Sequence, residues 1–145
     1  IQNCKPKFEQ ANLNISATGD GVKLQLDIDR FKQIMVNLLG NSIRYTEAGG
    51  EVQIHTEQDA HSWSVIVDDS PFGLTDEQIA HLGERFYRVD DSRTRSTGGT
   101  GLGLALSGKI AQALGGELSF DHSPLGGLRC KLTFSKQTHS KLTKV

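Results

Sequence analysis

The sequence predicts an α+β domain in which a mixed sheet of about five strands is covered on one face by about three helices. Short segments with alternating apolar residues flank longer segments whose apolar residues follow helical spacing. Polar or glycine-rich stretches separate these segments, as expected of turns. The 145 residues suffice for one hydrophobic core and are too few for two comfortable ones. The pattern therefore indicates one layered domain.

Alternating apolar residues identify the strands. Leu13, Ile15 and Ala17 alternate in the first one, and the turn Gly19-Asp20-Gly21 separates it from the second. A polar hairpin through Asp59-Ala60-His61 joins two later strands. The predicted strands cover residues 13–17, 22–28, 52–56, 63–67, 118–121 and 128–134.

Three helices are predicted from apolar residues at helical spacing. In the longest one, Asp29 is expected to cap a helix that runs to about Tyr45. A second helix begins at Thr75 and contains Ile79, Leu82 and Phe86, and a third covers residues 102–114 before Gly115-Gly116. Residues 87–100 are almost devoid of apolar side chains, which predicts a long functional loop.

The composition limits the class of protein. It is 36% apolar and 23% charged with a net charge of −1, which fits a folded domain without a nucleic-acid partner. Cys4 and Cys130 have no spacing typical of zinc, and we expect both to be reduced thiols. No segment predicts a signal peptide or a membrane span. We expect a linker or the end of an upstream helix at 1–12, the domain at 13–134 and a flexible tail at 135–145, all excised from a longer protein.

Polar residues form a stripe on the longest predicted helix. Asn37, Asn41 and Arg44 lie at positions i, i+4 and i+7. A solvated helix face is the alternative interpretation, but asparagine has a low helix propensity, and Lys or Glu would suit such a face better. An amide oxygen is a suitable ligand for a Mg²⁺ ion that also contacts phosphates, and Arg44 could contact the same phosphates.

A glycine loop, residues 98–103, opens directly into the third helix. Its backbone N–H groups and the helix N-terminus suit a polyphosphate, although such loops are common and the signal alone is weak. It lacks the preceding strand of a dinucleotide fingerprint and the Lys-Ser/Thr of a Walker loop. Asp69, at the end of a buried strand, could accept a hydrogen bond from the amino group of adenine, or could simply be a turn residue.

In this order the segments resemble the boxes of sensor histidine kinases. Residues 37–46 resemble the N box, 69–73 the G1 box, 84–88 the F box and 99–104 the G2 box. The resemblance covers residues 13–134 and implies the Bergerat (GHKL) fold, an α/β sandwich shared with Hsp90, gyrase B and MutL.

The resemblance also implies site residues. Asn41 would coordinate Mg²⁺, Asp69 would accept the adenine amino hydrogen, and Asn37, Arg85 or Arg88 would act near the transferred phosphate. The implied nucleotide-binding residues are Asn37, Asn41, Arg44, Tyr45, Asp69, Gly73, Gly99, Thr100, Gly101, Leu102 and Gly103.

One residue departs from the family pattern. Pro71 stands where the G1 box has its first glycine, and the pyrrolidine ring keeps φ near −65°. If that glycine is used at positive φ, the turn must differ here. We therefore expect weaker or altered nucleotide binding.

Asn37 distinguishes a kinase from an ATPase. The ATPases of this superfamily have a glutamate base four residues before the metal-binding asparagine, whereas an amide cannot deprotonate water. The resemblance therefore implies a protein-histidine kinase domain that binds ATP and Mg²⁺. A degenerate nucleotide-sensing module and a GHKL-type ATPase remain alternatives.

None of the five histidines lies in a phospho-acceptor context, so the acceptor would belong to a dimerisation domain of the same protein. The resemblance further implies a response regulator downstream and a full-length, membrane-bound homodimer. This fragment would be a monomeric domain on the cytoplasmic side of the inner membrane.

Overall fold

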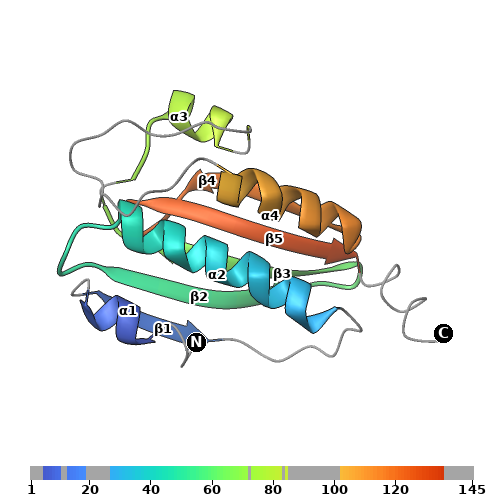
Figure 1. The fold of residues 1–145 in the computed structure, drawn as a ribbon, viewed down its shortest axis with the longest axis horizontal. Coiled ribbons are helices and arrows are strands. Elements are labelled where there is room, and N and C mark those ends of the chain that lie inside the picture. The colour runs from blue at the N-terminus through green and yellow to red at the C-terminus, as the bar shows by residue number, and fades with distance from the viewer. Residues whose placement is uncertain are drawn as a thin grey trace.

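The computed structural model describes residues 5–10, 13–18, 27–71, 73–82, 84 and 102–135. In chain order the elements are α1 (Lys5–Gln10), β1 (Asn14–Thr18), α2 (Ile28–Tyr45), β2 (Glu51–Gln58), β3 (Ser62–Asp69), α3 (Asp76–His81), α4 (Leu102–Ala113), β4 (Gly116–His122) and β5 (Leu128–Ser135). Figure 1 shows the strands as one sheet with α2 and α4 lying across it.

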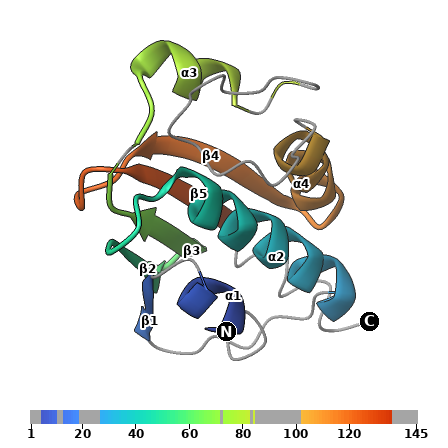
Figure 2. The same ribbon diagram turned by 60° about the vertical axis from the view of Figure 1, so that its left-hand side comes forward.

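The sheet is mixed, as predicted. Its strand order is β1-β2-β3-β5-β4, with β1 parallel to β2 and the remaining neighbours antiparallel. The turned view of Figure 2 shows α2 and α4 side by side on the same face, with α1 beside β1 and α3 beyond the end of the sheet. The predicted α+β fold of about five strands and three helices is confirmed.

The core lies between the sheet and the two long helices. On β5, Leu128, Cys130, Leu132 and Phe134 alternate with polar residues and are at most 1% exposed. The ring of Phe134 stacks on that of Trp63, with 6.0 Å between the centroids. Burying each large apolar side chain contributes about 1.5–3 kcal/mol, so this layer supplies much of the stability. Cys130 lies in this core as a free thiol.

The start of α2 differs from the prediction. Asp27, and not Asp29, is the N-cap, because its backbone is extended and its Oδ1 accepts hydrogen bonds from the N–H groups of Asp29 and Arg30 at 3.1 and 3.2 Å. Ile28 was expected to end a strand but is the first helical residue. The rest of that predicted strand, residues 22–26, lies outside the described residues.

The other helix boundaries follow the predicted signals closely. Thr75 caps α3 in a capping box with Gln78, and the helix ends at His81, so Leu82 is its C-cap. Phe86 lies outside the described residues. Gly115, with φ of +84°, follows α4, and Gly116 already belongs to β4. Within the described residues no helix is both long and apolar enough to span a membrane.

Candidate functional site

The polar stripe of α2 contains a buried amide without a partner. Asn41 is only 2% exposed, and neither its Oδ1 nor its Nδ2 has a hydrogen-bond partner within the described part of the chain. Leaving a buried polar group unpaired costs about 1–3 kcal/mol, so such a group is expected to have a binding partner. The amide of Asn41 therefore indicates a polar or ionic ligand.

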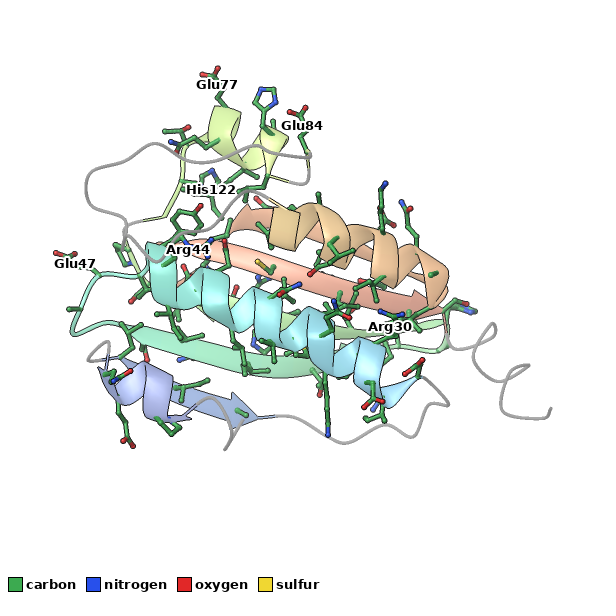
Figure 3. All side chains as sticks on the ribbon, viewed as in Figure 1. Arg30, Arg44, Glu47, Glu77, Glu84 and His122 are labelled. Carbon is green, nitrogen blue, oxygen red and sulfur yellow. The ribbon has the colours of Figure 1, made fainter. Side chains whose placement is uncertain are left out.

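Arg44 and Tyr45 lie one turn further along α2. The guanidinium carbon of Arg44 is 5.9 Å from the centre of the Tyr45 ring, and its buried Nε has no hydrogen-bond partner among the described residues. Figure 3 shows Arg44 at the C-terminal end of α2, on the side of the domain where α3 and His122 lie. A fixed cation at this place suits an anionic ligand.

Asn37 has a structural contact that the sequence did not indicate. Its Nδ2 donates a 2.9 Å hydrogen bond to Oγ of Ser107, which is fully buried on α4. This bond joins α2 to the helix that follows the glycine loop. Ser107 was missed by sequence reasoning, although a serine within the apolar stripe of a helix is a signal that could have found it.

Asp69 is the buried carboxylate predicted at the end of β3. It is 1% exposed, and its Oδ1 accepts a 2.7 Å hydrogen bond from the N–H of Leu128. Burial raises its pKa to about 7, while the Leu128 N–H and the hydroxyls of Ser42 and Thr46 oppose that rise in pKa. The group therefore changes its charge near neutral pH, which is typical of functional carboxylates.

The turn after Asp69 is held between two loops. The carbonyl of Pro71 accepts a 2.7 Å bond from the N–H of Glu47, which follows α2. On the other side a Cβ at Gly126 would lie 3.2 Å from Cγ of Pro71, and a Cβ at Gly73 would lie 3.0 Å from the carbonyl oxygen of Gly126. Gly73 also has φ of +75°, which glycine alone adopts without strain.

Gly127 allows the approach of β5 to Asp69. Its N–H donates a 3.0 Å bond to the Asp69 carbonyl. A Cβ at this residue would overlap Oδ1 and the carbonyl oxygen of Asp69 and the carbonyl oxygen of Ser70. No local sequence pattern indicates this role of Gly127, whereas the structure gives its physical reason.

Several predicted site residues lie outside the described residues, and their roles stay predictions: Arg85, Arg88, Gly99, Thr100 and Gly101. The backbone of Leu102 and Gly103 is described and forms the first residues of α4. A helix N-terminus therefore begins at Leu102, as predicted. Such an end has N–H groups available for an anion.

The donor set fits a single-residue Mg²⁺ site. Among the described residues, no group of three or more His, Cys, Asp or Glu side chains could hold a metal. The unpartnered Oδ1 of Asn41 is a neutral oxygen of the kind that Mg²⁺ accepts when phosphates and water supply its other ligands.

The α/β sandwich, the buried carboxylate of Asp69 and the unpartnered amide of Asn41 define a nucleotide-binding domain. The chain belongs to the family of histidine kinase-, DNA gyrase B- and HSP90-like ATPases, which matches residues 26–138. Members of this family bind ATP. The predicted membership of this superfamily is thereby confirmed.

Relatives of known class are sensor kinases. The chain is 43% identical to the signal transduction histidine-protein kinase BaeS of Escherichia coli K12, over 75% of this chain and 23% of the relative. It is 38% identical to the sensor histidine kinase YkoH of Bacillus subtilis 168, over 88% of this chain and 28% of the relative. The chain thus spans about a quarter of the length of these relatives, and the predicted resemblance to sensor histidine kinases is confirmed.

A solved structure agrees with this assignment. The catalytic domain of the histidine kinase ThkA superposes with a TM-score of 0.77 at 25% identity, covering 93% of this chain and 86% of that domain.

We predict that Gly127→Ala destabilises the domain by about 2 kcal/mol or more, because the added methyl group must displace Asp69 or Ser70. Urea denaturation followed by circular dichroism measures the change. Gly40→Ala is the matched control, since nothing lies within 4 Å of a Cβ at that residue of α2. It should stabilise the domain by about 0.5–1 kcal/mol. Equal effects of the two substitutions would contradict the prediction.

Asp69→Asn should stabilise the nucleotide-free domain at alkaline pH. The folded-state pKa of about 7 exceeds the ordinary value of 3.8, so the folded domain binds the proton more tightly than the unfolded chain does. The carboxyl group therefore lowers stability as pH rises from about 4 to about 7, by up to about 4 kcal/mol. The gain from Asp69→Asn should be largest at pH 8 and smaller at pH 5.

Urea unfolding at both pH values measures this gain, with the exposed Asp29→Asn as control. A gain that does not change with pH would refute the explanation.

Proposed function

We propose that the chain holds ATP with Mg²⁺ and donates the γ-phosphate of ATP to a histidine on a separate dimerisation domain of the same protein. The observation that carries this proposal is the buried amide of Asn41, which has no partner within the described residues. A bound metal–nucleotide complex would give this amide its missing partner and would remove the cost of leaving it unpaired.

Each part of the site has a role in this proposal. The carboxylate of Asp69 accepts the adenine amino hydrogen, and the glycines at 73 and 127 let the loop and β5 pack closely beside that carboxylate. Arg44 and the N-terminus of α4 supply positive charge for the phosphates. When bound, Mg²⁺ neutralises phosphate charge, and the proposed ligand is Oδ1 of Asn41. Arg85 or Arg88 would act at the γ-phosphate.

Asn37 favours transfer to a protein over hydrolysis by water. The amide has no useful basicity, and its Nδ2 is already bonded to Ser107. A water molecule near the γ-phosphate would therefore find no general base at this residue. This supports a kinase over a GHKL-type ATPase, while a degenerate nucleotide-sensing module differs from a kinase only in the transfer step.

The proposed partners follow from this role. The full-length protein would be a membrane-bound homodimer with this domain on the cytoplasmic side of the inner membrane, and a response regulator would receive the phosphate. Proteins of this fold offer precedents: ShkA was solved in complex with AMPPNP, and ThkA in complex with the response regulator protein TrrA.

Replacing the proposed metal ligand tests the function. In calorimetry with ATP, we expect Asn41→Ala to lose the Mg²⁺-dependent part of the affinity, at least about tenfold, and to change Mg²⁺-free binding much less. Lys32→Ala, an exposed change on the same helix, should bind like wild type. Equal losses with and without Mg²⁺ would argue against Asn41 as the ligand.

Incubation of the full-length protein with radiolabelled ATP should then give acid-labile phosphohistidine. Nucleotide binding without phosphohistidine would favour the sensing module.

The effect of Pro71 stays a prediction. If its fixed φ weakens nucleotide binding, Pro71→Gly should raise the affinity for ADP severalfold in calorimetry. Pro124→Gly is the matched control, because Pro124 is also exposed and lies in the turn between β4 and β5. Unchanged ADP affinity in Pro71→Gly would refute the idea.

A further inference from the structure

Two consecutive carboxylates at the end of β3 point to opposite faces of the sheet. Asp69 faces α2 and the proposed adenine site, whereas Asp68 faces the side of the sheet opposite the helices. Two consecutive residues of β5 hold them: the N–H of Leu128 donates to Asp69, and the side chain of Arg129 donates to Asp68. The same short piece of each strand therefore holds both carboxylates.

The bond between Arg129 and Asp68 is a bidentate ion pair. Nε and Nη2 of Arg129 lie 2.7 and 2.8 Å from Oδ1 and Oδ2 of Asp68. The Asp68 side chain is only 3% exposed and that of Arg129 27%, so water screens this pair weakly. A planar fork of this kind fixes the orientation of a carboxylate as well as its charge.

Other charged groups surround the pair on the same face. Nδ1 of His55 on β2 lies 3.9 Å from Oδ2 of Asp68, and Nε2 of the same ring lies 4.0 Å from Glu57. Lys131 lies 4.0 Å from Glu57, and Asp121 of β4 is opposite Arg129 in the strand register. Among the described residues, Arg129 alone makes a close, permanently charged contact with Asp68.

We propose that Arg129 is a positioning residue for nucleotide recognition, which acts through Asp68 to keep Asp69 ionised from the opposite face of the sheet. This inference rests on the proposed role of Asp69 at the adenine. By neutralising Asp68, Arg129 limits the repulsion between the two neighbouring carboxylates.

The expected consequence is a shift in a pH profile. The charge of Asp68 already raises the pKa of Asp69, and loss of the guanidinium would leave that charge unopposed. A further rise of about 0.7 pH unit would make ADP binding about threefold weaker at pH 7 and leave it unchanged at pH 9. Loss of a purely structural contact would weaken binding equally at both pH values.

The experiment compares Arg129→Gln with three other variants of this chain. Arg129→Lys keeps the charge, Lys131→Gln removes a neighbouring charge of the same strand and face, and the double variant Arg129→Gln with Asp68→Asn removes both charges of the pair. The midpoint of the Asp69 carboxyl titration is measured by carbon NMR in the free protein, with His55→Gln as background to remove the titration of that ring. ADP affinity is measured by calorimetry from pH 6 to pH 9.

We expect Arg129→Gln to move two midpoints to higher pH: that of the Asp69 titration and that of the pH profile of ADP affinity. Arg129→Lys and Lys131→Gln should leave both midpoints unmoved, and the double variant should restore them. Unmoved midpoints in Arg129→Gln, or no restoration in the double variant, would overturn it. The NMR titration needs no nucleotide, so it tests the coupling of Arg129 to Asp69 even if the proposed function fails. A moved carboxyl midpoint with an unmoved ADP profile would refute the role in nucleotide recognition.

Discussion

Burial of the Asp69 carboxyl group between β3 and β5 is the constraint on which the site end of this domain depends. Its Oδ1 reaches the N–H of Leu128 at 2.7 Å, and this requires that Gly127 has no side chain. Nearby, a Cβ on Gly126 would crowd the ring of Pro71, and a Cβ on Gly73 would crowd the carbonyl oxygen of Gly126. Close packing around this acceptor thus involves three glycines on two segments far apart in the sequence.

This arrangement opposes stability and favours binding. A carboxyl whose pKa is raised to about 7 is costly to ionise, and the buried amide of Asn41 has no partner among the described residues. Both costs lie along α2 and the adjoining end of β3, where a nucleotide would satisfy the two groups. Elsewhere in the mainly apolar core, the buried Nε1 of Trp63 is a further donor without a partner among the described residues.

On the opposite face of the sheet, the buried carboxylate has a charged partner. Asp68 is nearly as buried as Asp69, but the guanidinium of Arg129 donates a hydrogen bond to each of its two oxygens. Because consecutive side chains of a strand point to opposite faces, the two carboxylates lie on different sides of the sheet. They remain close neighbours, because a single peptide bond joins the two residues. Here a partly exposed residue outside the helical layer influences the chemistry of a buried one.

The sequence by itself determined the α+β class, most strand and helix positions, and the Asn41 and Asp69 candidates, because periodicity and capping are local properties of the chain. It misplaced the cap of α2 by two residues, since Asp27 and Asp29 are equally suitable in sequence and only the backbone at Asp27 is extended. The tertiary structure alone decided the bond between Asn37 and Ser107, 70 residues apart, and the pairing of Asp68–Asp69 with Leu128–Arg129. These contacts depend on helix packing and strand register, which join residues that no local pattern relates.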